Sequence, residues 1–237
     1  MTPFFQDSID TLMSSRSTED VRFQLLKIAH LLGFENFAFG TRAPSLDSSP
    51  KVIMVNSYTD SWNELYQKND FILIDPIVKK ATFSTEPILW ENELTESNDF
   101  CDAAKDCGLS IGWSNAIHKP NGASSLFSVC RSLESLTDKE LNKISPYLYW
   151  VSNLAVQTLE RVNNEYAGVV LTEILTPREI EILKWSSEGK TANEIAIILG
   201  ISVRTVTFHI TNSVAKLNAC NKTSAIIKAV SLGLLDI

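Results

Sequence analysis

The chain has 237 residues, of which 44% are hydrophobic and 21% are charged, and its formal net charge at pH 7 is −7. This composition is typical of a globular protein and excludes an intrinsically disordered one. No cationic segment precedes an apolar core at the N-terminus, and no apolar stretch approaches the length of a membrane span. We therefore expect a cytoplasmic protein with no membrane partner.

The first part of the chain mixes helical and strand patterns. Helical spacing in VRFQLLKIAHLLGF is followed by strand-like runs in FENFAFG and KVIMVNSY, then more helix, then a strand in SSLFSVCR. This order predicts an antiparallel sheet flanked by helices, an N-terminal α/β/α sandwich of the α+β class. A long helix is expected from Thr137 to Arg161, with a kink or break at Pro146.

One acidic residue interrupts the apolar run FILIDPIV. A buried carboxylate such as Asp75 is costly unless donors pair with it. Asp-Pro is a common helix start, in which Asp75 caps backbone N–H groups and Pro76 is the first helical residue. The donor can instead arrive with a ligand, and these residues alone leave both interpretations open.

Cysteine and histidine usage indicates no metal site. The cysteines, Cys101, Cys107, Cys130 and Cys220, form no CxxC pair, and the three histidines are scattered. We expect no metal, no cofactor and no structural disulfide, and a redox-sensing pair of Cys101 and Cys107 is the alternative.

A change of pattern divides the chain in two. The segment NNEYAGVV is a plausible linker, and the prediction is a domain at 1–165, a linker at 166–173 and a second domain at 174–237. From Leu171 onward there are seven Lys/Arg and six Asp/Glu, a balance of +1, whereas the preceding 170 residues have a balance of −8. The C-terminal part is therefore the candidate for DNA contact.

Two short helices with matching start signals open the C-terminal part. Thr176 and Glu179 form a capping box with Pro177 at the first helical position, and Thr191 with Glu194 repeats the device. Gly189 and Gly200 are expected to end these helices. The residues expected to face the core are Ile180, Leu183 and Lys184 in the first helix and Ile195, Ile198 and Leu199 in the second.

A third helix is predicted in SVRTVTFHITNSVAKLN, and a final one at about Lys222 to Leu232. In the third, Val206, Ile210, Val214 and Leu217 lie on one apolar stripe. The opposite stripe holds Arg204, Phe208, Thr211 and Asn212, with Thr207 at its edge.

This helix, glycine turn and second helix have the design of a unit that enters the major groove of DNA. Phosphate contacts are expected from Thr191, Ser202 and the helix N-terminal amides, and positive charge is expected from Lys190, Arg204, Lys216 and Lys222. A helical protein-interaction module without a DNA role is the alternative on geometry alone.

The segment LTPREIEILKW..EGKTANEIAIILGISVRTVTFHI resembles the DNA-binding domain of the LuxR-type transcriptional regulators. The near-invariant Glu, Leu and Gly of that domain match Glu179, Leu183 and Gly189. The resemblance implies a four-helix helix-turn-helix domain that binds double-stranded promoter DNA. Many relatives carry lysines where this chain has Thr207 and Thr211, which places those two contacts in doubt.

The N-terminal half resembles the autoinducer-binding domain of the same family, and not a phosphorylated receiver domain. The signature positions are matched by Trp62, Tyr66, Asp75, Pro76, Trp90 and Gly112. Together with the C-terminal part, the resemblance covers almost the full chain. The segments GTRAP and DPIVKK look most like the QscR-like subgroup.

The resemblance implies an N-acyl-homoserine lactone as ligand. Asp75 would accept from its amide N–H, Trp62 would donate to the lactone carbonyl, and Tyr58, one helical turn before Trp62, would donate to the amide carbonyl. Tyr66 would line the acyl chain and Trp90 would pack on the lactone ring. For each aromatic residue, ordinary core packing is the alternative.

Two further positions match the acyl-chain region. Ser128 matches a hydroxyl near the acyl 3-position, although a strand serine can also bond to backbone. The small Ala38 and Gly40 would leave room for the end of the chain.

The overall expectation is a ligand-bound homodimer on a pseudo-palindromic DNA site, since dimerisation doubles the phosphate and base contacts of one short helix. The alternatives are a solo regulator of this type that responds to another small molecule, or one that binds DNA without ligand. An enzyme, such as a lactone hydrolase, is disfavoured because the chain has no catalytic residues in an HxxxH or GxSxG arrangement.

Overall fold

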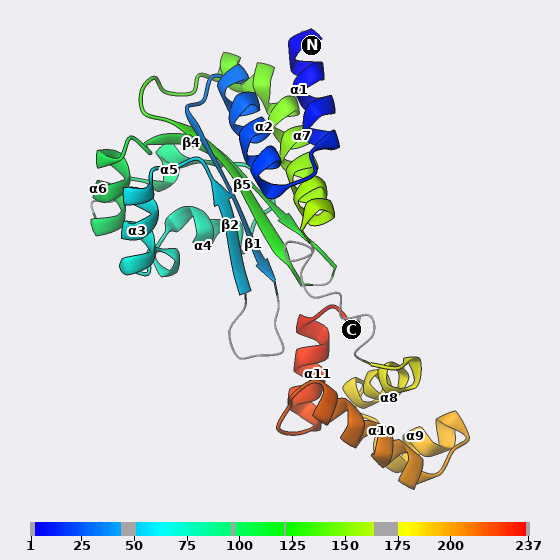
Figure 1. Ribbon diagram of the computed structural model, residues 1–237. Helices are drawn as coiled ribbons and strands as arrows, with labels where there is room; N and C mark the ends of the chain where they lie inside the picture. Colours follow the sequence, from blue (N-terminus) through cyan, green and yellow to red (C-terminus); the bar gives the residue numbers. More distant parts are fainter. Residues whose placement is uncertain (1–2, 44–50, 96–97, 121, 164–174, 236–237) are drawn as a thin grey trace. The chain divides into compact units, whose positions relative to one another are not determined.

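The computed structural model describes residues 3–43, 51–95, 98–120, 122–163 and 175–235. These residues form two compact units: the first contains residues 3–41, 52–118 and 124–163, and the second contains residues 175–235 (Figure 1). The predicted linker, 166–173, lies outside the described residues. Among the described helices, none is by itself long and apolar enough to cross a membrane. Taken together, the helices Ala192–Leu199 and Val203–Lys216 reach that length and hydropathy, but the pair is bent by 112°.

The described part of the first unit is a five-stranded sheet, in the order β2-β1-β5-β4-β3, with helices on both faces (Figure 1). The strands are β1 (Asn36–Ala43), β2 (Lys51–Asn56), β3 (Ile88–Leu89), β4 (Ile111–His118) and β5 (Ser124–Arg131). The helices are α1 (Pro3–Ser14), α2 (Thr18–Leu31), α3 (Asp60–Lys68), the 3-10 helix η1 (Phe71–Leu73), α4 (Pro76–Ala81), α5 (Trp90–Glu93), α6 (Asp99–Asp106) and α7 (Asp138–Val162).

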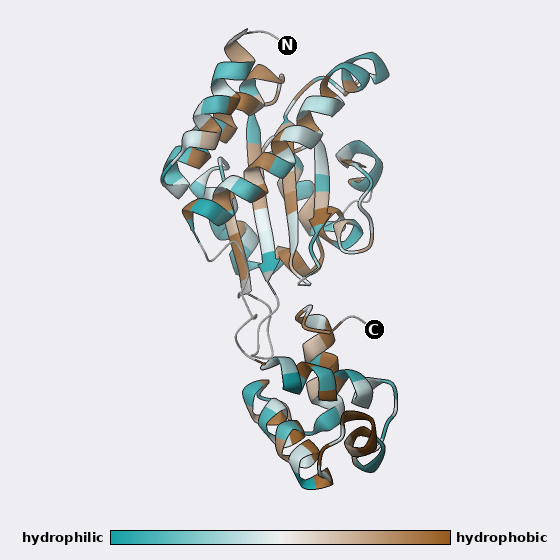
Figure 2. Ribbon diagram, turned by 90° about the vertical axis from the view of Figure 1, so that its right-hand side faces the viewer, coloured by the Kyte–Doolittle hydropathy of each residue, from teal (hydrophilic) through white to brown (hydrophobic). Residues whose placement is uncertain are grey.

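The two faces of the sheet bury two separate cores. Phe37, Phe39, Trp113 and Phe127 belong to a core with α1, α2 and α7. Because strand side chains alternate between faces, their neighbours contribute to a second core with α3 to α6. The predicted α/β/α sandwich is confirmed, and Figure 2 shows the hydrophobic stripes of its amphipathic helices.

The strand β4 and the short β3 were not among the sequence-based expectations. They pair antiparallel with each other, and β4 pairs antiparallel with β5 so that Ser114 lies opposite Ser128. The central residues 112–116 of β4 are all buried, so the strand has no polar face to produce an alternating pattern.

Of the kink or break expected at Pro146, the break is wrong, because α7 continues through this residue. Pro146 is exposed, while Ile144 and Leu148 on either side are buried in the first core. Packing of this apolar face holds the helix together despite the missing N–H donor.

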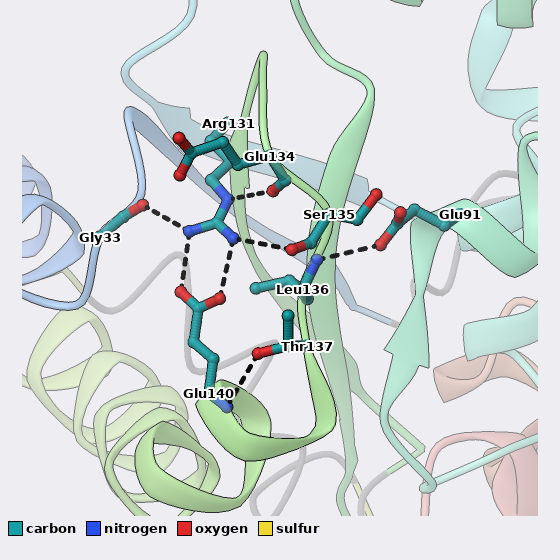
Figure 3. Close-up of polar contacts among 8 residues, drawn as sticks. All are labelled: Gly33, Glu91, Arg131, Glu134, Ser135, Leu136, Thr137 and Glu140. Carbon is teal, nitrogen blue, oxygen red and sulfur yellow. Dashed lines mark hydrogen bonds and ion pairs between the residues drawn. The ribbon is translucent and has the colours of Figure 1, made fainter.

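The start of α7 is fixed by Arg131 at the end of β5 (Figure 3). Its guanidinium forms a bidentate ion pair with Glu140, at 2.8 and 2.9 Å. It also donates to the backbone carbonyls of Glu134, Ser135 and Gly33. All five N–H donors of Arg131 are therefore used, and the sheet, the end of α2 and the first turn of α7 are joined at one residue.

The second unit consists, in its described residues, of α8 (Pro177–Ser187), α9 (Ala192–Leu199), α10 (Val203–Lys216) and α11 (Lys222–Ser231). Both predicted capping boxes are present, at Thr176 with Glu179 and at Thr191 with Glu194. Gly189 and Gly200 have positive φ, at 84° and 63°, a conformation that glycine adopts without strain. The four-helix domain is confirmed.

Two expected core positions in this unit are wrong. Lys184 is exposed and Ile182 is buried, while Ile198 is 44% exposed and Ala196 is buried. The buried face of α8 therefore begins at the capping residue Glu179, which is itself 2% exposed. The apolar stripe of α8 is offset from the one expected because Glu179, a charged residue, occupies part of the buried face.

Candidate functional site

An aromatic cluster lies on the sheet face covered by α3 to α6. Trp62 and Tyr66 are four residues apart on α3, and their rings are 5.8 Å apart. Phe71 and Phe100, which the sequence analysis did not single out, lie 6.2 and 6.0 Å from the Trp62 ring. Trp62 is 4% exposed, and no described residue accepts a hydrogen bond from its indole N–H.

Asp75 accepts three hydrogen bonds from the protein. Its Oδ1 accepts from the backbone N–H of Ile77 and Val78 at 2.8 and 3.3 Å, and its Oδ2 accepts from the Tyr66 hydroxyl at 3.0 Å. The local interpretation is confirmed, with Asp75 as N-cap of α4 and Pro76 in its first turn. Oδ2 has one protein donor, so it keeps capacity for another.

The ionisation of this pair follows from its burial. Burial raises the pKa of Asp75, while hydrogen bonds from Tyr66 and the two backbone amides lower it. Burial, and then the neighbouring Asp75 charge, raises the pKa of Tyr66, so the phenol remains a donor. The result is a buried acceptor held by neutral donors.

Tyr58 lies before the first turn of α3, whose N-cap is Thr59, so its expected place one helical turn ahead of Trp62 is wrong. Its hydroxyl oxygen accepts from the thiol of Cys130 at 3.9 Å. Burial raises the pKa of Tyr58 and raises that of Cys130 to about 12, so both stay protonated. Among the described residues, none accepts the hydroxyl proton of Tyr58.

A chain of hydrogen bonds connects Trp90 to the sheet. The indole N–H of Trp90 donates to Ser114 Oγ at 2.7 Å, and Ser114 Oγ lies 2.7 Å from Ser128 Oγ. Ser128 therefore bonds to a side chain, not to backbone. A Cβ on Gly112 would lie 2.5 Å from Cδ2 of Trp90, so only glycine lets the indole ring lie on this strand.

Two small residues of β1 complete this face. Ala38 and Gly40 alternate with the buried Phe37 and Phe39, which places them on the opposite side of the sheet, half-buried. A Cβ on Gly40 would meet the Met54 side chain at 3.7 Å, an ordinary contact. The structure thus brings all seven predicted ligand residues to one side of the first unit, and adds Ser114 and Cys130.

The second unit exposes the predicted DNA-contacting face of α10. Arg204, Thr207, Phe208 and Thr211 are exposed, with Phe208 at 60%, and Asn212 is half-buried. The hydroxyls of Thr207 and Thr211 donate to backbone carbonyls one turn earlier, each at 3.0 Å. Their oxygens can still accept.

The residues expected to hold phosphates lie at helix starts. Thr191 and Ser202 are the N-caps of α9 and α10, and Lys190 directly precedes Thr191. Lys216 does not act as a free cation, because its Nζ pairs with the buried Glu179 at 2.8 Å. The positive charge available for DNA is therefore smaller than the sequence indicated.

Metal-ligating and thiol groups do not converge in the described residues. No group of three or more His, Cys, Asp or Glu there is placed to hold a metal ion. Cys101 and Cys130 are buried, Cys107 and Cys220 are exposed, and all four are free thiols.

Comparisons with known proteins agree with both halves of this arrangement. The family model "Autoinducer binding domain" matches residues 17–159, and "Bacterial regulatory proteins, luxR family" matches residues 173–229. The chain belongs to the LuxR family of bacterial transcriptional regulators. It is an autoinducer-responsive regulator with a helix-turn-helix DNA-binding domain, and the proteins of this family are not enzymes.

The similarity to individual proteins covers nearly the whole chain. Transcriptional activator protein AnoR of Acinetobacter nosocomialis is 36% identical over 92% of this chain and 93% of its own. A crystal structure of Escherichia coli SdiA matches with a TM-score of 0.81 and 29% identity over 98% of both chains. SdiA in complex with octanoyl-rac-glycerol matches with a TM-score of 0.79 and 30% identity, over 99% of this chain and 97% of that one. The likeness to the QscR-like subgroup stays a prediction.

Proposed function

We propose that this LuxR-family regulator binds an N-acyl-homoserine lactone between its sheet and helices α3 to α6, and that the liganded protein binds promoter DNA as a homodimer. The observation that carries this proposal is a set of unused donors in an apolar cluster. The indole N–H of Trp62 and the hydroxyl proton of Tyr58 have no acceptor among the described residues. Tyr58 is close enough to the buried acceptor Asp75 for that charge to raise its pKa, and Trp62 packs on Tyr66, which donates to Asp75.

The chemistry of the ligand complements these groups. An acyl-homoserine lactone has one amide N–H, for which Asp75 Oδ2 is an acceptor, and two carbonyls, for which Trp62 and Tyr58 are donors. Tyr66, Trp90, Ser128 and Ala38 then border the ring and the acyl chain. At ~0.8 kcal/mol per buried methylene, a chain with about eight methylenes contributes roughly 6 kcal/mol. We therefore expect affinity to depend strongly on chain length.

Dimerisation follows from the size of the DNA contact. One α10 helix presents few base-contacting side chains, and Lys216 is engaged with Glu179. A second copy on a pseudo-palindromic site doubles the contacts. A ligand that fills the second core raises the population competent for DNA by mass action. Such a regulator acts in the cytoplasm, where the promoter DNA is.

A different acyl ligand is the second candidate. The structure of SdiA with octanoyl-rac-glycerol concerns a ligand with an ester carbonyl and hydroxyls in place of the amide. Such a molecule would use the donors Trp62 and Tyr58 and would give Asp75 a hydroxyl proton. An acylglycerol therefore belongs in the same ligand panel.

The test is the thermal stability of the full chain with lactones of graded chain length and with octanoylglycerol. Wild type is expected to show a length-dependent rise in Tm with the lactones. Trp62→Phe keeps a ring but removes the N–H, so it should lose ~10- to 100-fold in ligand potency. Trp150→Phe, at a tryptophan that is 37% exposed and outside the cluster, is the matched control. Equal potency for wild type and Trp62→Phe would contradict the assigned role.

A further inference from the structure

One side of α10 is left uncovered by the rest of the DNA-binding unit. The helix packs against α8, α9 and α11, and its inner side contributes Val206 and Ile210 to a core. On the other side Arg204, Phe208 and Thr211 follow each other at spacings of four and three, and all three are exposed. Because residues three or four apart are neighbours on a helix surface, Phe208 and Thr211 lie side by side in this stripe.

The hydroxyl group of Thr211 has its proton engaged within the helix. Its Oγ1 lies 3.0 Å from the backbone carbonyl oxygen of Thr207. A carbonyl oxygen can only accept, so the direction of this hydrogen bond is fixed. Toward DNA, Thr211 therefore presents an acceptor. To donate to a base it would have to give up the bond to its own backbone, which lowers affinity by about three- to tenfold.

Phe208 supplies an apolar surface beside this acceptor. Its side chain is 60% exposed, and its ring lies 5.6 Å from that of the adjacent His209. The cationic side chains of α10 belong to other positions, since Arg204 lies one turn earlier and Lys216 pairs with Glu179. The middle of the stripe thus combines one acceptor with one apolar group.

This combination complements one kind of base pair in the major groove. Adenine presents an amino group that donates, and the thymine paired with it presents a methyl group. Cytosine also presents an amino group, but the guanine paired with it presents two acceptors and no methyl group. Guanine is usually read by Arg or Lys donors, which the middle of this stripe does not supply.

We propose that the Thr211 hydroxyl accepts a hydrogen bond from an adenine amino group and that Phe208 contacts the methyl group of the paired thymine, so that the middle of α10 reads an A·T base pair in each half-site. This inference rests on the DNA-binding part of the proposed function. It assigns a base preference to two residues of α10, whereas the lactone acts in the other unit.

The first experiment is a selection from random double-stranded DNA by the full chain, with and without octanoyl-homoserine lactone. We expect a pseudo-palindromic site in which each half-site has a strongly preferred A·T pair. Thr211→Val, which has a similar shape but no hydroxyl, should relax the preference at that pair and leave the other positions unchanged. Thr211→Ser restores a hydroxyl and should restore the preference.

Base analogues then test each half of the contact on the selected duplex. Uracil in place of thymine removes only the methyl group and should weaken wild-type binding by about fourfold per half-site. 2-Aminopurine in place of adenine removes the amino group from the major groove and adds one in the minor groove. The matched reference is 2,6-diaminopurine, which has both amino groups. Relative to it, 2-aminopurine should weaken binding by about three- to tenfold per half-site.

Variants assign each effect to one side chain. Phe208→Ala should become insensitive to uracil, and Thr211→Val should become insensitive to 2-aminopurine, because each has already lost the group that makes the contact. Thr223→Val makes the same substitution at an exposed position of α11 and should respond to both analogues as wild type does. A residue that only stabilises the helix would weaken binding to all of these duplexes equally.

The outcomes distinguish this inference from the proposed function. Selection of no sequence in either condition would overturn the DNA-binding part of the proposed function and this inference with it. A selected site with G·C at the pair that Thr211→Val relaxes, or equal Kd values with thymine and uracil, would overturn this inference alone. An A·T-containing site selected equally with and without the lactone would contradict the proposed ligand dependence and support the base assignment.

Discussion

The two units of this regulator are built on different kinds of contact. In the DNA-binding unit, the side chain of the residue before each helix accepts a hydrogen bond from the backbone N–H three residues later, as at Thr176, Thr191 and Ser202. In the ligand-binding unit, the site is assembled from partners far apart in the chain, such as Trp90 with Ser114 and Tyr58 with Cys130. The first arrangement satisfies the N–H groups of its helix starts locally, whereas the second leaves the indole N–H of Trp62 without an acceptor among the described residues.

The largest expected effect is at an ion pair that joins two helices of the DNA-binding unit. Glu179 closes the capping box of α8 and also pairs with Lys216 on α10. Glu179→Ala removes the cap and leaves Lys216 without its partner, so we expect a loss of about 3 kcal/mol in unfolding free energy. Denaturant unfolding of the full chain, followed for this unit by the Trp185 signal, measures it.

The control is the second capping box, which has the same geometry but no ion pair. Glu194 bonds only within the first turn of α9 in the described structure. Glu194→Ala should cost ~1 kcal/mol. Equal losses for the two substitutions would show that the distant ion pair adds nothing.

A second substitution tests the close packing of the ligand-binding unit. Gly112→Ala places a methyl group 2.5 Å from the Trp90 ring, so the indole must move and its bond to Ser114 is disturbed. We expect a loss of about 1–3 kcal/mol in stability and a weaker ligand response. Gly40→Ala, whose methyl group meets Met54 at 3.7 Å, should change stability by much less. A stable Gly112→Ala protein with an unchanged ligand response would contradict this packing role.

A third prediction concerns acid stability. The Arg131 guanidinium, by hydrogen bonding to Glu140, lowers the pKa of that carboxyl below its ordinary value. The ion pair therefore stabilises the fold above the unfolded-state pKa of about 4.3, and this contribution is lost as pH falls through the lower folded-state pKa. Glu140→Gln should cost about 1 kcal/mol at pH 7 and progressively less in acid. A pH-independent cost, measured by denaturant unfolding, would count against the ion pair.

The smallest change in stability is expected for a substitution on the exposed face of α10. Its effect is measured as a change in DNA affinity. Thr207→Lys adds a cation to a side chain that bonds only to its own helix among the described residues. Promoter binding should tighten and its salt dependence should steepen by about one phosphate contact. Thr223→Lys, which adds the same charge at the start of α11, is the control. Equal effects of both would mean that net charge alone accounts for the gain.

Local signals in the sequence correctly predicted the second unit, except for two core positions. Lys184 and Ile198 were misassigned because burial there depends on how α8, α9 and α10 pack, and Glu179 takes up part of the buried face. In the first unit, β4 was missed because a strand buried on both faces has no alternating pattern. The helix is not broken at Pro146, because the buried residues on both sides of it pack against the first core.

By itself, the sequence determined the two-part organisation and the helix starts, because caps, glycine turns and apolar periodicity act over a few residues. It also showed that Asp75, in the apolar run FILIDPIV, needs hydrogen-bond donors. The tertiary structure decided how Asp75 is used, as the cap of α4 and the acceptor for Tyr66 at once. It also decided that Ser114 and Ser128 meet, since strand register fixes which side chains oppose each other. Hydrogen-bond partners across a sheet depend on that register, and no local pattern records it.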